Sequence, residues 1–271
     1  MTTVPIRILL AALIAVAHLG AADLTDKQKE RFLREAEVIA AKQLSTGITL
    51  SERLTLSHGT LIHDAQFQDV DEFKPLFQGS SGPPVNFRDS YRYNIAAYRL
   101  DRLLGLEMTP VSIERKYRGR TGAFTWWVNN VLMMEIERWK RRIDPPDPDR
   151  WNLQMYQVRI FNELIYNTDP NLGNVLIDNE WHIWMIDFTR AFRSFKKLRE
   201  PENLDGVRID RVAWANLRKL DDRALRKTMG DMLLKTERKA LLERRDAIVA
   251  IFQERIAREG EDAVLCELPQ R

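Results

Sequence analysis

Three oxygen-bearing side chains, Asp169, Asn174 and Asp187, stand at spacings that could do chemistry together. Asp169 and Asn174 belong to the turn-rich segment 166–174, and Asp187 follows the pattern of a β-hairpin turned near residues 178–180. That turn puts Asn174 within about two positions of facing Asp187, and cross-strand neighbours lie roughly 5 Å apart. An amide oxygen and a carboxylate at that separation suit Mg²⁺, which completes its shell with phosphate oxygens. Asp169, slightly upstream, would orient or deprotonate an attacking hydroxyl.

The same residue types also have a purely structural interpretation. Asp, Asn, Pro and Gly are ordinary turn formers, and an Asp after a strand often caps the next element. Other chemistries find less support. His58, His63 and His182 are scattered and lack the His-Glu-x-x-His spacing of zinc hydrolases, and no Gly-x-Ser-x-Gly elbow is present. The basic segment 118–122 is better explained as a hairpin turn than as a nucleic-acid loop.

Hydrophobic periodicity outlines the elements that must position these residues. An apolar-faced helix over 151–166 leads into the turn with Asp169, and strands over 175–178 and 181–186 deliver Asp187. Upstream, the pattern predicts a helix over 24–43, short strands between 48 and 68 turned at His58-Gly59, a loop over 77–87, a helix over 93–104 stopped by Gly105, and strands over 111–117 and 123–128.

This order of elements predicts an α+β protein with two lobes. The first part is rich in strands, a connector follows near Asn129, and the second part is mostly helical to about Gly260. We expect a small N-lobe over residues 23–129, built from a helix, antiparallel strands and a second helix. We expect a larger helical C-lobe over residues 130–271, which carries the turn and the hairpin.

The segment from Asp169 to Phe188 resembles the catalytic core of the protein-kinase-like superfamily. There a catalytic Asp is followed five residues later by a metal-binding Asn, and a second metal-binding Asp opens an Asp-Phe-Gly motif. Here Asp169 and Asn174 are five residues apart, Asp187 follows thirteen later, and Asp187-Phe188 supplies two of the three motif residues. The resemblance implies a two-lobed protein-kinase-like fold that binds ATP with Mg²⁺ or Mn²⁺. It further implies Asp169 as the catalytic residue and Asn174 and Asp187 as the metal ligands.

Residues 93–110 resemble the N-lobe regulatory helix of one subgroup. That subgroup comprises lipid kinases of the phosphatidylinositol 3-/4-kinase type and the secretory-pathway kinases. By the same resemblance, Trp126-Trp127-Val128 forms the last strand before the hinge, and Trp127 lines the adenine pocket. The resemblance extends over roughly residues 48–192, and the remaining residues match only as generic C-lobe helices.

Two positions depart from the pattern of active kinases. The strand Lys that holds the α- and β-phosphates should fall at Gln68, and its partner Glu should fall at Asn94. Both are neutral amides, and this paired replacement avoids a lone buried charge. Gln68 can still donate a hydrogen bond to phosphate, but without charge assistance. Lys74 or Lys42 would supply the missing cation by swinging in, unless both are solvated surface residues.

The phosphate cover and the segment after Asp187 also differ. No Gly-x-Gly-x-x-Gly loop or Walker motif is present, and Ser45-Thr46-Gly47 offers the only short cover. Thr189 stands where Gly is usual, and no Ala-Pro-Glu follows. Five basic residues between 190 and 199 would receive an acidic or phosphorylated substrate, or would form a solvated charged face.

Composition and the N-terminus bear on partners and location. The 271 residues suffice for two lobes around a cleft, and a net charge of +3 is too weak a bias to argue for nucleic acid. Arg7, an apolar run over 8–19 and small residues at 20–22 have the pattern of a signal peptide, with an uncleaved anchor as the alternative. We expect residues 1–22 to be removed and the mature chain to be periplasmic or extracellular, without a transmembrane span. The single Cys266 forms no intramolecular disulfide.

Three functions remain open at this point. The first is an exported, metal-dependent ATP phosphotransferase whose acceptor is a protein, a lipid, a sugar or a small molecule. The second is a pseudokinase that binds a nucleotide or a partner without phosphotransfer, because Gln68 and Asn94 replace the Lys-Glu pair. The third is a helical structural or envelope-associated protein that only mimics the spacing. The oligomeric state is not indicated by the sequence.

Overall fold

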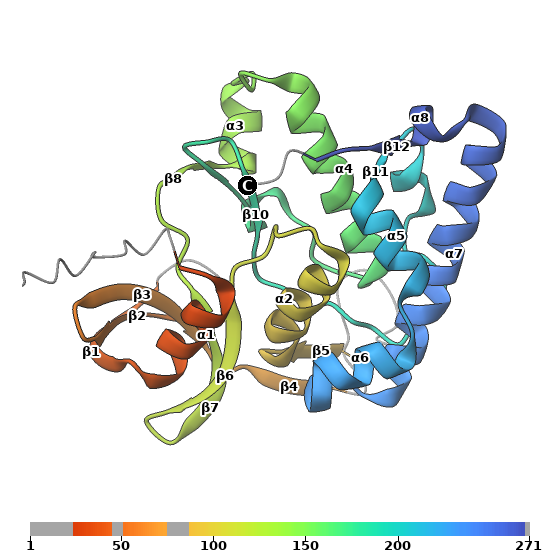
Figure 1. The fold of residues 1–271 in the computed structure, drawn as a ribbon. Helices are drawn as coiled ribbons and strands as arrows, with labels where there is room; N and C mark the ends of the chain where they lie inside the picture. The colour runs from red at the N-terminus through yellow and green to blue at the C-terminus, as the bar shows by residue number, and fades with distance from the viewer. Residues whose placement is uncertain (1–23, 45–50, 75–86, 269–271) are drawn as a thin grey trace, which may run out of the picture.

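The computed structural model describes residues 24–44, 51–74 and 87–268. The expected signal peptide over 1–22, the Ser45-Thr46-Gly47 segment and nearly all of the expected loop over 77–87 lie outside these residues. Figure 1 shows a strand-rich N-terminal part beside a larger helical C-terminal part. The predicted α+β class, with strands first and helices later, is confirmed.

A five-stranded antiparallel sheet, ordered β1-β2-β3-β7-β6, forms most of the N-terminal part. One face of this sheet is buried through alternating residues such as Leu54 and Leu56 of β2. Helix α1 (Asp26–Glu35) covers that face with Phe32 and Leu33. The strands are Glu37–Gln43 (β1), Glu52–His58 (β2), Leu61–Gln68 (β3), Ser112–Tyr117 (β6) and Arg120–Trp126 (β7).

The helix predicted over 24–43 is wrong in its second half. α1 begins at a capping box between Thr25 and Gln28, and it ends at Ala36, whose ψ of 141° is extended. The chain then continues as β1, which pairs with β2 along its length. A short apolar run such as Val38-Ile39-Ala40 fits a helix or a strand. The strand forms because β2 supplies hydrogen-bond partners for its backbone.

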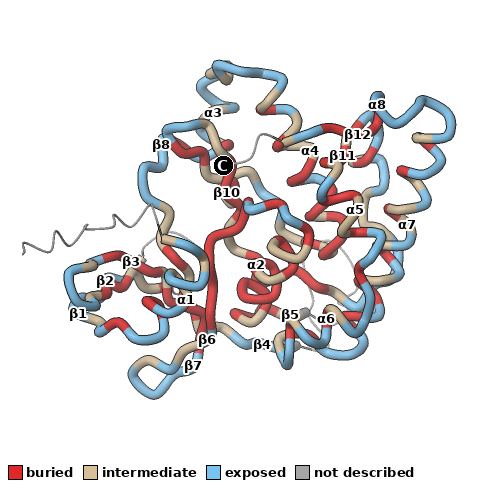
Figure 2. Tube along the Cα trace, in the orientation of Figure 1, coloured by how far each residue is buried: buried red, intermediate tan, exposed pale blue. Residues whose placement is uncertain are grey.

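Helix α2 (Arg92–Leu104) lies between the sheet and the C-terminal helices. It follows the short antiparallel pair β4 (Asp71–Lys74) and β5 (Phe87–Ser90). As predicted, it ends at Gly105, whose φ of 77° is left-handed. α2 contacts β6 and β7 as well as helices α5 (Arg211–Lys219) and α6 (Asp222–Met229), and most of its residues are buried (Figure 2). It therefore joins the two parts of the molecule.

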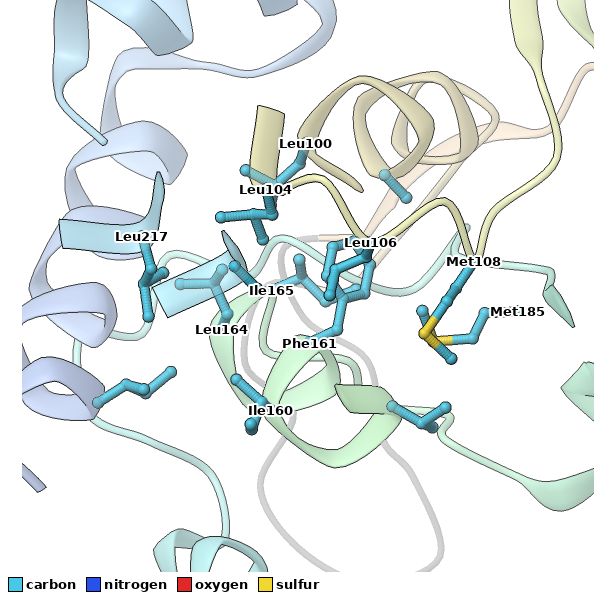
Figure 3. Close-up of a cluster of buried hydrophobic side chains, with 14 of the residues drawn as sticks. Leu100, Leu104, Leu106, Met108, Ile160, Phe161, Leu164, Ile165, Met185 and Leu217 are labelled. Atoms are coloured by element: carbon cyan, nitrogen blue, oxygen red, sulfur yellow. The ribbon is translucent and has the colours of Figure 1, made fainter. Parts of the chain in front are cut away.

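The C-terminal part packs around α4 (Pro148–Leu164). Figure 3 shows Leu100 and Leu104 of α2 in the same core as Phe161 and Leu164 of α4. The remaining elements are the helices Glu135–Arg141 (α3), Arg211–Lys219 (α5), Asp222–Met229 (α6), Lys235–Glu259 (α7) and Glu261–Val264 (α8), three 3₁₀ turns, Leu172–Asn174, Pro201–Leu204 and Gly230–Met232, and the parallel pair Ile209–Asp210 (β11) and Leu265–Cys266 (β12). None of the helices within the described ranges has the length and apolarity needed to cross a membrane.

A three-stranded antiparallel sheet, ordered β10-β9-β8, follows the connection between the two parts. Its strands are Val131–Met134 (β8), Val175–Asp178 (β9) and Ile183–Met185 (β10). The β9–β10 hairpin turns where predicted, because the backbone N–H of Trp181 donates to the carbonyl of Asp178 at 3.0 Å. The open end of this hairpin lies at the segment that carries Asn174.

Candidate active-site cleft

A cavity of about 700 Å³ lies between the N-terminal sheet and the segment that follows α4. Its walls come from β2, β3 and β7, from the connection around residues 127–131, and from residues 169–190. Five of the residues that the sequence assigns to a site line this cavity: Gln68, Trp127, Asp169, Asn174 and Asp187. The fold therefore gathers residues from two sheets, the connection and one loop around a single cavity.

The β9–β10 hairpin places Asn174 beside Asp187. The ladder ends with Val175 opposite Met185, and the N–H of Ile186 donates to the carbonyl of Asn174 at 3.0 Å. Asp187 is thus one residue past the position that faces Asn174. Its φ of 57° is left-handed, which is uncommon for residues other than Gly and marks local strain of the kind found at functional sites.

The Asp187 carboxylate carries poorly compensated negative charge. Burial raises its pKa above the usual range, a hydrogen bond from the Thr189 hydroxyl at 3.2 Å lowers it, and the nearby carboxylates of Asp89 and Asp169 raise it again. The hydroxyl of Thr189, at the position where Gly is usual in the kinase-like motif, orients this carboxylate. Excess negative charge at this point of the cleft favours a bound cation.

Asp169 is held by side chains of its own turn. Asn171 Nδ2 donates to Asp169 Oδ1 at 3.0 Å, and Asn167 Oδ1 accepts from the Asp169 N–H at 3.0 Å. Asn174 Nδ2 donates to the carbonyl oxygen of Asp169 at 3.4 Å. Since the amide nitrogen of Asn174 is turned toward Asp169, its oxygen is the atom that can bind a cation. Arg190 Nη1 lies 3.4 Å from Asp169 Oδ2.

This donor set fits a divalent cation of the Mg²⁺ or Mn²⁺ type. Asp187 brings a charged oxygen and Asn174 an amide oxygen, the ligands that hard cations prefer. In the described ranges, no group of three or more His, Cys, Asp or Glu residues is arranged to hold a metal ion. Asn174 and Asp187 would therefore share the cation with phosphate oxygens and water, as is usual for Mg²⁺.

Gln68 and Asn94, the two residues that the resemblance assigns to the kinase ion pair, form a hydrogen bond. Asn94 Nδ2 donates to Gln68 Oε1 at 2.7 Å, and Asn94 Oδ1 accepts from the N–H of Phe188 at 2.7 Å. Both amides are buried, and Gln68 lines the cavity whereas Asn94 is not among its described lining residues. Asn94 therefore connects β3 to the residue next to Asp187.

Trp127 lies on the connection between the two parts, and its environment is built from β2 and β3. The guanidinium of Arg53 lies over its ring at 4.3 Å from the centroid, and Arg53 also pairs with Asp64 at 2.5 Å. His63 Nε2 lies 3.0 Å from the Trp127 carbonyl, and its ring stacks on Trp126 at 3.7 Å between centroids. These contacts fix a flat aromatic wall that suits a planar ligand such as a base.

Of the two lysines expected as replacement cations, Lys42 is not among the described lining residues of the cavity. Lys42 is exposed on β1, and Lys74 ends β4 with a side chain outside the described part. The positive charges on the described wall are those of Arg53 and Arg190. From sequence, Arg190 stands out only within the basic segment 190–199, yet its position three residues after Asp187 is the signal that could have placed it at the site.

No protein-family model matches the chain, and no curated protein sequence matches it. Solved structures do match. The structure of hydra Fam20 with sugar has 16% identity and a TM-score of 0.62, over 89% of this chain and 92% of that chain. The Golgi casein kinase has 13% identity and a TM-score of 0.59, over 89% of this chain and 78% of that chain. The same kinase with Mn and ADP bound has 13% identity and a TM-score of 0.58.

These similarities concern the fold, since the identities are low. They confirm the two-lobed, protein-kinase-like architecture that the resemblance of the segment from Asp169 to Phe188 implies.

Proposed function

We propose that this protein binds ATP with a divalent cation in the cleft and transfers the terminal phosphate to a hydroxyl group of an acceptor. The observation that carries the proposal is that Asp169, Asn174 and Asp187 line one cavity together with Trp127. The volume of about 700 Å³ falls within the range of small-molecule sites. The three polar residues also keep the spacing that phosphotransfer requires in kinase-like proteins.

Each residue has a defined task in this proposal. Asp169 accepts the proton of the acceptor hydroxyl as that oxygen forms a bond to the γ-phosphorus, and the bond from this phosphorus to the β–γ bridging oxygen breaks, so that ADP leaves. Asn171 and Asn167 keep Asp169 oriented through their hydrogen bonds. Asn174 and Asp187 would hold the divalent cation, which supplies positive charge to the phosphates. Gln68 would donate its amide to a phosphate oxygen.

The similar structures support the proposal from a different direction. One of them, the Golgi casein kinase, is a kinase by name and was solved with Mn and ADP bound. Another, hydra Fam20, was solved with a sugar. A nucleotide with Mg²⁺ or Mn²⁺ is therefore the first ligand to test, and protein, lipid head group and sugar are the acceptor classes to test after it.

Binding is tested by thermal unfolding of the purified protein with and without ATP, Mg²⁺ and Mn²⁺. Ligand at about 100 times its dissociation constant stabilises the native state by roughly 2.7 kcal/mol. For a domain of this size, that corresponds to about 2–4 °C per kcal/mol. We expect a metal-dependent rise in Tm that is lost in Asp187→Asn, a change that tolerates the left-handed φ. Asp205→Ala, which removes an exposed carboxylate, is the matched control and should keep the rise.

Catalysis is tested separately, by transfer of labelled phosphate from ATP to water, to the protein itself and to candidate acceptors. Asp169→Asn should keep the metal-dependent thermal shift, because the residue is not assigned to the metal, and should lose at least about 100-fold in transfer rate. A parent protein as inactive as Asp169→Asn would contradict the phosphotransferase.

A second candidate function is a pseudokinase, a kinase-shaped module that binds nucleotide or a partner without phosphotransfer. The observation that favours it is the neutral hydrogen bond between Gln68 and Asn94, at 2.7 Å, where active kinases hold a charged pair. A nucleotide-dependent thermal shift without transfer to any acceptor would favour this function. Metal-dependent transfer that Asp169→Asn abolishes would exclude it.

We further propose that the chain is exported after cleavage before Asp23. The support is the pattern of residues 1–22, and one similar structure is a kinase named for the Golgi. Expression of the full chain in a bacterium, followed by fractionation and N-terminal sequencing, tests this. A chain that keeps Met1 and stays in the cytoplasm would overturn the proposal.

A further inference from the structure

The cleft needs a positive charge that its strand does not provide. Phosphoryl transfer spreads negative charge over the γ-phosphate oxygens, and kinases and related enzymes meet it with a Lys or an Arg as well as with metal. Gln68 occupies the strand position with a neutral amide. On the described wall of the cavity, the positively charged side chains are Arg53 and Arg190.

The contacts of the two arginines assign them to different parts of the cavity. Arg53 covers the ring of Trp127 and pairs with Asp64 on the neighbouring strand. That position suits contact with a planar base. Arg190 lies instead at Asp169, with Nη1 at 3.4 Å from Oδ2, where the proposed acceptor hydroxyl and the γ-phosphate would meet.

The backbone of Arg190 is anchored next to Asp169. Its carbonyl accepts from the hydroxyl of Thr168 at 2.8 Å and also from the Thr168 N–H at 3.4 Å. The preceding residue, Thr189, accepts at its carbonyl from the N–H of Ser90 at 2.8 Å. Arg190 is thus fixed at the start of its side chain, so that only the guanidinium would need to move to meet a ligand.

The guanidinium is aimed by Asp89. Arg190 Nε donates to Asp89 Oδ2 at 3.0 Å, and the Asp89 side chain is only 5% exposed. The other oxygen, Oδ1, is buried without a hydrogen-bond partner in the described structure, and Oδ2 is the oxygen that pairs with Arg190. The Arg190 side chain itself is 26% exposed, and it belongs to the lining of the cavity.

The contact with Asp169 is the weaker of the two. Charge-assisted hydrogen bonds are normally about 2.7–2.9 Å long, so the 3.4 Å separation leaves room for a better partner. A phosphate group is such a partner, since its oxygens match the planar fork of an arginine. The bond to Asp89 can persist while the guanidinium turns its terminal nitrogens to phosphate.

We infer that Arg190 binds the γ-phosphate of a nucleoside triphosphate and so supplies, from the segment after Asp187, the positive charge that Gln68 does not carry. Asp89 is its positioning residue. The inference rests on the proposed nucleotide site. It predicts that this site binds a nucleoside triphosphate more tightly than the corresponding diphosphate.

The test compares the dissociation constants of ATP and ADP, both with Mg²⁺, by isothermal titration calorimetry on the full chain. Arg190→Gln should raise the dissociation constant of ATP by about 10- to 100-fold, the value of a hydrogen bond to a charged group. The dissociation constant of ADP should change less than about twofold. Arg190→Lys, which keeps the charge, should recover part of the loss. Asp89→Asn should lower the preference for ATP over ADP in the same direction by a smaller factor.

Two controls separate this effect from general damage. Lys196→Ala removes an exposed cation of the same segment, which pairs with Glu243 at 3.3 Å on the surface, and should leave both dissociation constants unchanged. Arg53→Ala should raise the dissociation constants of ATP and ADP by the same factor, because both nucleotides carry the base that Arg53 would contact. Unfolding midpoints without nucleotide identify any variant that is merely less stable, and Arg190→Lys then serves as the informative variant.

The outcomes distinguish the inference from the function on which it rests. Equal weakening of ATP and ADP in both Arg190 variants, or no weakening in either, overturns the inference and leaves the proposed site intact. Failure of the parent protein to bind either nucleotide overturns the proposed function and the inference together. A loss confined to ATP that Arg190→Lys partly restores supports the inference.

Discussion

At the scale of single residues, the side chain of Asn94 links two segments that border the cleft. One amide group joins Gln68 on β3 to the backbone of Phe188, the neighbour of Asp187. An ion pair could link the same strand and helix, but it would carry two charges out of water, at a cost that good geometry must offset. The neutral pair avoids that cost and still fixes the segment on which Asp187 lies.

The neutrality of this pair can be tested by exchanging it for charges. Asn94→Glu alone should destabilise the protein by about 3–5 kcal/mol, because it buries a carboxylate beside a neutral partner. Adding Gln68→Lys should recover at least half of that loss. The measurement is urea unfolding of the parent, both single variants and the double variant, combined as a double-mutant cycle. Additive effects in that cycle would show that the two side chains do not interact.

At the scale of elements, helix α2 depends on a buried carboxylate near its C-terminal end. Asp101 is fully buried, accepts from the N–H of Met108 at 3.1 Å and pairs with Arg102. Arg102 reaches on to Asp26 at 2.5 Å and so ties α2 to α1. Burial is the largest influence on Asp101 and raises its pKa from 3.8 to about 6, although Arg102 and the Met108 N–H act in the opposite direction.

This raised pKa predicts the sign of a pH dependence. A carboxyl whose pKa is higher in the folded state stabilises the fold below its unfolded pKa, and that contribution is lost as the pH rises through the folded pKa. For Asp101 the loss should occur between about pH 4 and pH 6. The difference in unfolding free energy between the parent and Asp101→Asn should therefore shift against the parent across this range and stay constant above it. Urea unfolding at several pH values measures it, and a difference that does not vary with pH would contradict the raised pKa.

At the scale of the whole molecule, the two parts are joined by more than the connection around Asn129. Most of the buried apolar residues of α2 belong to the same hydrophobic core as the C-terminal helices, although the predicted N-lobe over 23–129 includes α2. Glu237 of α7 adds hydrogen bonds between the two parts. It is buried and accepts from the hydroxyl of Tyr93 at 2.5 Å and from Arg88 at 3.3 Å. The boundary between the lobes stays a prediction, because α2 packs on both sides.

Removing the hydrogen bonds of Glu237 should lower the unfolding free energy of the whole molecule. Glu237→Ala should cost about 3–5 kcal/mol, since it leaves Arg88 without its buried partner. Tyr93→Phe should cost only about 1–2 kcal/mol, the value of one hydrogen bond that leaves a buried acceptor less satisfied. Glu243→Ala on the same helix is the control, because its pair with Lys196 is exposed and worth less than about 1 kcal/mol. Chemical unfolding followed by tryptophan fluorescence gives the unfolding free energy of the three variants. Equal losses of unfolding free energy in Glu237→Ala and Glu243→Ala would contradict a stabilising role of the Glu237 hydrogen bonds.

The core of the candidate site could be predicted because its geometry is local. Residues 169–187 form a turn and a tight hairpin, and period-2 pairing then decides that Asn174 comes beside Asp187. The end of α2 at Gly105 was predictable for a similar reason, since few residues other than Gly adopt a left-handed φ. The strand β1 was not predictable, because residues 37–43 suit a helix or a strand equally well. Pairing with β2 decides for the strand.

By itself, then, the sequence determined the fold class, the order of helix, turn and hairpin around the site, and the spacing of Asp169, Asn174 and Asp187. Only the tertiary structure decided that Asn94 bonds to both Gln68 and Phe188, and that Arg190 lies between Asp89 and Asp169. The physical reason is the range of the interactions. Turns, caps and hairpins depend on residues a few positions apart, whereas contacts between distant segments depend on how whole helices and sheets pack, which no local pattern encodes.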